Sequence, residues 1–157
     1  MLALFVYLLC LVCWFGGMIF FSVFTAPIIF TVLPVAEAGK VVGGIFPRYY
    51  LMGYVAGVVS SILAAYFAIA HAPRLWWGLA ALALVIAFGV TCYAGIVVRP
   101  RIDSIRAVNE EPNPDAARKA EFDRLHHLSV TLNVAAMALN LAALLSTAAA
   151  LAPNARS

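Results

Sequence analysis

The stretch LWWGLAALALVIAFGVTCYAGIVV, residues 75–98, contains no aspartate, glutamate, lysine, arginine or histidine. A membrane-spanning helix needs about 20 mainly apolar residues, because each residue adds a rise of about 1.5 Å and the hydrocarbon core is about 30 Å thick. Three further apolar runs in the chain meet the same requirement. The sequence therefore predicts four membrane spans, at approximately residues 3–33, 48–70, 75–98 and 125–150.

The composition points to the same class of protein. Apolar residues make up 65% of the chain and charged residues only 11%, whereas soluble domains average about 25% charged residues. The apolar runs are continuous, unlike the alternating pattern of a barrel strand, and a helix satisfies its own backbone hydrogen bonds in lipid. We predict an all-α fold, a four-transmembrane-helix bundle, as a single integral membrane domain over residues 1–157.

The first apolar run could be mistaken for a signal peptide. It is much longer than the roughly 7–15 residues of a signal-peptide core, and no lysine or arginine precedes it. We expect it to be retained as the first membrane helix.

The basic residues predict the orientation of the bundle, because lysine and arginine concentrate in cytoplasmic loops. Two basic residues, Arg74 and Arg156, fall on one side of the predicted membrane. The other side, with the loop 99–124, carries the remaining eight: Lys40, Arg48, Arg99, Arg101, Arg106, Arg118, Lys119 and Arg124. We expect that side to be cytoplasmic and both termini to lie outside, in an integral protein of the bacterial inner membrane.

Prolines mark expected irregularities in the helices. Pro27 should kink the first helix, because proline removes a hydrogen bond and clashes with the preceding turn, and Pro34 should end that helix. A short cytoplasmic segment is expected at residues 35–46. The third helix should continue beyond Arg99 as an amphipathic extension, and Asp115 is a suitable N-cap for the last helix.

Small residues recur every fourth position in the second span, at Gly53, Gly57, Ser61 and Ala65. Such a face lets a neighbouring helix approach closely. The face predicts close packing, either inside one bundle or in a homo-oligomer.

Polar residues of the last span suggest a lined cavity. His126, Asn133 and Asn140 are spaced seven residues apart and therefore share one helix face. Polar groups in a membrane rarely face lipid, so this face should point into the bundle, either as interhelical hydrogen bonds or as the wall of a pocket.

A second candidate feature is a ring of cations at the cytoplasmic ends of spans two to four. Arg48, Arg99, Arg101 and His126 fall at similar depth and could hold an anion or a lipid phosphate. The alternative is ordinary anchoring, which the orientation rule alone explains.

Cys10 and Cys13 form a C-x-x-C pair that is a weak candidate for a metal or redox site. Free cysteine commonly packs as a small apolar residue, and Cys92 lies at a different predicted depth. We predict no cofactor. The chain shows no nucleophile–base–acid set and no basic–aromatic stripe, so we expect neither an enzyme nor a nucleic-acid-binding protein.

Several short motifs, in order, resemble the transmembrane protein 205 family. They are Trp14-Phe15-Gly16, Leu33-Pro34, Phe46-Pro47-x-Tyr49-Tyr50, Pro100-Arg101 and Phe122-x-Arg124-x-His126-x-Leu128-Ser129-x-x-x-Asn133. The resemblance implies mainly a membrane architecture, and the association of the family's animal members with resistance to platinum drugs suggests handling of small compounds. Arg99 stands where animal members would carry an acidic residue. The Trp-Phe-Gly-Gly at Trp14 is also similar to copper-resistance and haem-handling families, but this chain lacks their histidine in the first span.

Three hypotheses follow for the function. The first is binding or transport of a small molecule, ion or lipid through a cytoplasm-facing pocket lined by Arg48, Arg99, Arg101, His126, Asn133 and Asn140. The second is a structural protein that assembles through small-residue helix faces, and the third is a metal- or haem-dependent membrane oxidoreductase. Membrane lipid is the expected partner in each case.

Overall fold

The computed structural model describes residues 1–109 and 116–152. Every element in this part of the chain is helical, which confirms the all-α prediction. In chain order the elements, with η marking a π-helical segment, are α1 (Leu2–Ile19), η1 (Phe20–Thr25), α2 (Ala26–Val32), α3 (Val35–Ala70), α4 (Arg74–Tyr93), η2 (Ala94–Val98), α5 (Arg99–Asn109) and α6 (Ala116–Leu151).

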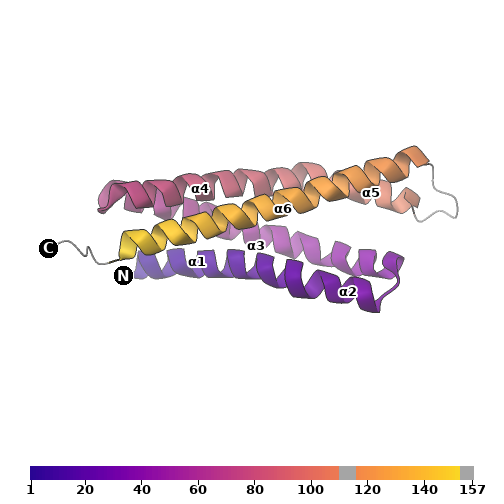
Figure 1. Ribbon diagram of the computed structural model, residues 1–157, viewed down its shortest axis with the longest axis horizontal. Coiled ribbons are helices and arrows are strands. Elements are labelled where there is room, and N and C mark those ends of the chain that lie inside the picture. The colour runs from indigo at the N-terminus through magenta and orange to yellow at the C-terminus, as the bar shows by residue number, and fades with distance from the viewer. Residues whose placement is uncertain (110–115, 153–157) are drawn as a thin grey trace.

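These elements form four long rods that run side by side (Figure 1). α3 packs against α1 and α4, and α4 also packs closely against α6, while α1 and α6 make a looser contact that closes the bundle. The start of α1 and the end of α6 lie at one end of the bundle, and α2 and α5 lie at the other, which we call the α2/α5 end (Figure 1).

Four helices are long and apolar enough to cross a membrane, as predicted. In the most apolar part of each one, only 22% to 39% of the residues are buried inside the bundle. Most of the apolar surface therefore points outward, where water would be unfavourable and lipid is the matching solvent.

The centre of the bundle is built on one tryptophan and two glycines. The Trp14 side chain of α1 is 1% exposed and lies against α3. A Cβ placed on Gly53 or Gly57 would approach the indole ring to 3.2 Å or 3.1 Å, respectively. Gly53, Gly57 and Ser61 are buried within this single chain, whereas Ala65 at the end of the predicted small face is exposed.

A buried hydrogen bond joins α1 and α6 near the end of the bundle that lies opposite the α2/α5 end. The Tyr7 and Thr147 hydroxyl oxygens lie 2.6 Å apart, and the Thr147 hydroxyl also donates to the Ala143 carbonyl at 2.7 Å. Because a threonine hydroxyl has one proton, Tyr7 is the donor in the first bond.

Both π-helical segments end two residues before a proline. η1 ends at Thr25, before Pro27, and η2 ends at Val98, before Pro100. Proline cannot donate a helical hydrogen bond, and its ring crowds the preceding turn, so a wider turn with i→i+5 bonds accommodates it. The irregularity predicted at Pro27 takes this form, and α2 slants away from the line of α1 (Figure 1).

Helix boundaries differ from the sequence prediction at one place. The segment 35–46 was expected to be a short connection, but it forms the first part of α3, and Pro47 lies inside that helix. Glu37 in its first turn favours helix initiation, because acidic side chains stabilise a helix N-terminus. Pro34 ends the preceding helix as predicted, α5 is the predicted extension, and the predicted N-cap Asp115 lies outside the described residues.

Candidate functional site

The largest cavity that we describe is a groove between α3 and the η2–α5 segment at the α2/α5 end. Its volume is about 270 Å³. We call it the Arg99 groove, and its lining residues are Gly43, Phe46, Pro47, Tyr50, Tyr54, Gly95, Arg99 and Asp103.

Arg99 is the buried cation of this groove. Its side chain is only 9% exposed, and Nη2 lies 2.7 Å from Oδ1 of Asp103, one helical turn further along α5. Its Cζ atom lies 4.2 Å from the centroid of the Phe46 ring of α3. The guanidinium is thus oriented by a carboxylate and by a cation–π contact, which is strongest where water is excluded.

The π-helical turn places Arg99 in the groove. The backbone N–H of Arg99 donates to the carbonyl of Ala94, five residues earlier. One extra residue per turn rotates every following side chain by about 100° about the helix axis. Arg99 therefore faces α3 because Pro100 favours a wide turn just before it.

Aromatic rings form the α3 wall of the groove. Phe46, Tyr50 and Tyr54 are spaced one turn apart, and successive rings stack with centroids 5.8 Å and 6.1 Å apart. A Cβ on Gly95 would collide with Tyr54 and Tyr50, so the glycine makes room for these rings on the opposite wall.

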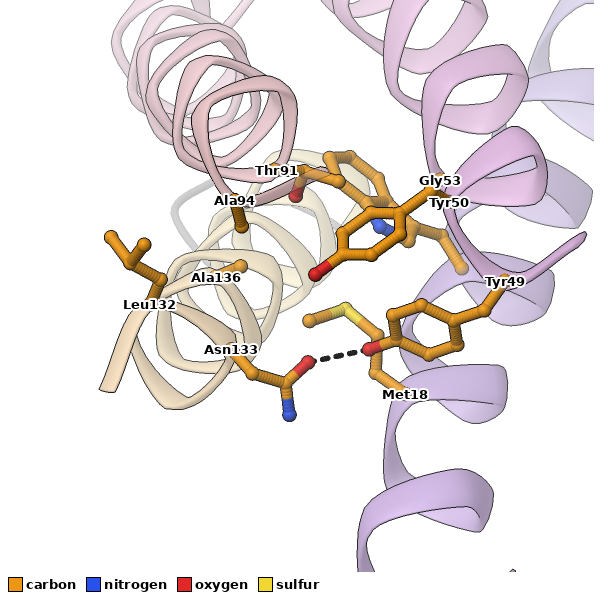
Figure 2. Close-up of a pocket in the computed structure, with 10 residues that line it drawn as sticks. Met18, Tyr49, Tyr50, Gly53, Thr91, Ala94, Leu132, Asn133 and Ala136 are labelled. Atoms are coloured by element: carbon orange, nitrogen blue, oxygen red, sulfur yellow. Dashed lines mark hydrogen bonds between the residues drawn. The ribbon is translucent and has the colours of Figure 1, made fainter. Parts of the chain in front are cut away.

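A polar cluster lies between α3 and α6, where the Tyr49 and Asn133 side chains meet (Figure 2). The Tyr49 hydroxyl donates to Oδ1 of Asn133 at 2.5 Å, and Nδ2 of Asn133 donates to the Ser22 hydroxyl at 2.8 Å. This cluster therefore joins α3, α6 and η1. It borders an interior void of about 10 Å³, close to the minimum that holds one water molecule.

Tyr50 separates the two features, because its ring lines both the interior void and the Arg99 groove. Its side chain is buried, and its hydroxyl points toward α6 (Figure 2). The groove and the polar cluster therefore share one aromatic wall.

Replacing Tyr49 by phenylalanine should weaken the α2/α5 end of the bundle. The substitution removes the bond to Asn133, and interhelical hydrogen bonds in membranes contribute about 0.6 kcal/mol on average and up to about 1.7 kcal/mol. The expected result is a lower melting temperature of the purified protein in detergent. Tyr66→Phe, at an exposed position of α3, is the control and should change nothing; equal losses in both variants would contradict the role of the bond.

The other residues predicted from the sequence lie outside these two features. Arg48 and Arg101 have exposed side chains, and Nη1 of Arg48 donates to the Gly44 carbonyl at 3.4 Å. His126 is exposed and stacks on Phe122. Asn140 is fully buried deeper in the bundle, where Nδ2 donates to the Ala136 carbonyl at 2.9 Å and Oδ1 has no hydrogen-bond partner.

The cysteine pair lies in α1. Cys10 is partly buried and Cys13 is exposed, and neither forms a disulfide. Among the described residues, no group of three histidine, cysteine or acidic side chains is placed to hold a metal ion.

The sequence analysis named Arg99 and Asn133 as candidates but did not name the residues that contact them. Tyr49 and Tyr50 were recognised only as part of the Phe46-Pro47-x-Tyr49-Tyr50 motif. The signal for the aromatic wall is the spacing of Phe46, Tyr50 and Tyr54, and the signal for the ion pair is the i,i+4 spacing of Arg99 and Asp103.

Comparison with known protein families gives a match to an uncharacterised family. A family model described as a domain of unknown function, DUF4149, matches residues 9–111. No curated protein and no solved structure matches the chain. The matched region contains every lining residue of the Arg99 groove, as well as Ser22 and Tyr49 of the polar cluster.

Proposed function

The chain belongs to the DUF4149 family, and we propose that it is an integral membrane protein that binds a ligand with a charged or strongly polar group in the Arg99 groove. The observation that carries the proposal is the position of Arg99, a cation that is 9% exposed on the wall of a cavity of about 270 Å³. This is the first of the three functions that the sequence suggested. Of the six candidate residues, only Arg99 lines the groove, and Asn133 lies in the adjacent polar cluster.

The surroundings of Arg99 support binding over simple anchoring. An arginine that serves only the positive-inside rule can extend to the membrane surface, as an exposed side chain does. Arg99 instead is buried against the Phe46 ring of α3 and the Asp103 carboxylate, and a buried ionisable side chain in a membrane is costly and usually functional. Arg48 and Arg101, at comparable positions, are exposed and suit anchoring.

The test is the ligand content of the purified protein. Native mass spectrometry of the wild type, released gently from the membrane, should show an adduct of defined mass. Arg99→Gln should reduce its occupancy about 10-fold or more, because a hydrogen bond to a charged group contributes about 1.5–3 kcal/mol. Arg101→Gln, an exposed cation two residues away, should leave it unchanged. Equal occupancy in all three proteins would refute the proposal.

We further propose that the groove opens toward the cytoplasmic leaflet of a bacterial inner membrane. Eight of the ten basic residues lie at the α2/α5 end, which supports this orientation by the positive-inside rule. The resemblance to the transmembrane protein 205 family supports a role in handling small compounds at that face.

Reporter fusions test the orientation. Alkaline phosphatase, which is active only outside the cytoplasm, should be active when fused after Leu151 and inactive when fused after Asn109. The opposite pattern would place the groove on the outer face.

A further inference from the structure

The Arg99 groove changes in character along its length. At the α2/α5 end it carries Arg99 and Asp103, with the Phe46 ring against Arg99. Tyr50 and Tyr54 follow Phe46 along α3 toward the middle of the bundle, with successive ring centroids 5.8 Å and 6.1 Å apart. A groove that is ionic at the membrane surface and aromatic deeper in the bilayer matches an amphiphile, with a charged headgroup and an apolar chain.

The ionic part of the groove carries two opposite charges. The Arg99 guanidinium and the Asp103 carboxylate are 2.7 Å apart, so the pair is close to neutral overall. A purely anionic headgroup would be attracted by Arg99 but repelled by Asp103. A headgroup with both a phosphate and a cation would be attracted by both residues.

One lining residue of the groove, Gly43, has a backbone carbonyl without its usual helical donor. Pro47 has no N–H and therefore donates no helical hydrogen bond to the carbonyl of Gly43, one turn earlier in α3. Gly43, Pro47 and Asp103 all line the groove. A carbonyl and a carboxylate together suit a primary ammonium, which has three N–H donors, better than a quaternary ammonium, which has none.

From these observations we infer that the groove binds a zwitterionic phospholipid with a primary ammonium, the chemistry of phosphatidylethanolamine. The phosphate contacts Arg99, the ammonium contacts Asp103 and the Gly43 carbonyl, and an acyl chain lies along Tyr50 and Tyr54. This inference rests on the proposed function of the groove and adds the class of ligand.

Native mass spectrometry of the protein in detergent, titrated with lipids of identical acyl chains, tests the inference. Phosphatidylethanolamine should bind as one copy per chain, about 10-fold more tightly than phosphatidylcholine or phosphatidylglycerol. Asp103→Asn should reduce phosphatidylethanolamine binding to the level of phosphatidylcholine, and Arg99→Gln should weaken binding of all three lipids. Arg101→Gln is the control and should bind as the wild type does, and melting curves confirm that each variant is folded.

The outcomes separate the inference from the proposed function. If phosphatidylglycerol bound most tightly and Asp103→Asn had no effect, the inference of a zwitterionic ligand would be wrong. The proposal that a ligand binds at Arg99 would still stand. If water-soluble phosphoethanolamine bound as tightly as the lipid, the inference that the ligand is an amphiphile would be wrong. The proposed headgroup site would still stand. Binding of every lipid unchanged by Arg99→Gln would overturn both. If Arg99→Gln does not fold, competition between the lipids on the wild type and on Asp103→Asn decides the same question.

Discussion

Trp14→Ala should destabilise the bundle by about 3 kcal/mol, one of the two largest effects that we expect. Burial of tryptophan in soluble cores is worth about 3–5 kcal/mol by alanine substitution. In a membrane the separated helices are already in an apolar solvent, so only the lost packing counts and the lower end of this range applies. At about 2–4 °C per kcal/mol, the melting temperature in detergent should fall by about 6–12 °C.

Trp76→Ala is the matched control for this measurement. Trp76 is 40% exposed on α4, whereas Trp14 is 1% exposed. Its removal should change the melting temperature little. If both variants melted alike, Trp14 would not be the centre of the packing.

Gly57→Leu should cause a loss of similar size for the opposite reason. A Cβ on Gly57 would lie 2.7 Å from Cδ2 of Phe88 and 3.1 Å from the Trp14 ring, so the larger side chain forces α3 away from α1 and α4. Overpacking typically costs about 1–3 kcal/mol, and leucine at a helix–helix contact should reach the upper part of that range. Gly89→Leu, where no atom lies within 4 Å of an added Cβ, should melt like the wild type.

Combining the two changes tests whether they act at one contact. In the double variant Trp14→Ala/Gly57→Leu, the leucine can occupy part of the space left by the indole ring. The double variant should therefore be more stable than the sum of the two losses predicts. If the two losses of stability were strictly additive, the two residues would not share one contact. That result, or a change in oligomer size that persists in the double variant, would instead support the hypothesis that Gly57 lies between copies of the chain.

The fold was largely predictable because its main determinants are local. Runs of apolar residues set the number of spans, Pro34 ends a helix, and the pattern after Arg99 predicted the extension that forms α5. The first part of α3 was not predicted, because glycines and a proline at residues 39–47 are typical of a connection. Tertiary packing overrides that preference, since Ala38, Gly39 and Val42 are buried.

The sequence predicted how far along the bundle the candidate residues lie, but not in which direction their side chains point. Arg48, Arg99 and Arg101 were placed correctly near one end of the bundle, yet side chains at similar depth can point to different sides of their helices. Successive residues differ by about 100°, and the π-helical turn before Arg99 adds an offset that no hydrophobic pattern shows. Of the cations that were expected to form a ring, only Arg99 lies in the groove, where it contacts Asp103 and the aromatic wall of α3.

Contacts between distant helices were the least predictable part. Asn133 was predicted to face the interior, and its bonds to Tyr49 and Ser22 place it there. Its partners depend on how far each helix is shifted along its neighbours. That register is set by packing such as the contact of Trp14 with Gly53 and Gly57, which spans two helices.

An experimental density map of the protein in nanodiscs made from its native membrane lipids would test the central claim most directly. We predict density for one non-protein molecule in the groove between α3 and α5, with a polar group within hydrogen-bonding distance of the Arg99 guanidinium. A well-resolved Arg99 groove containing only water, or a bound molecule that lies elsewhere and leaves Arg99 untouched, would contradict the account.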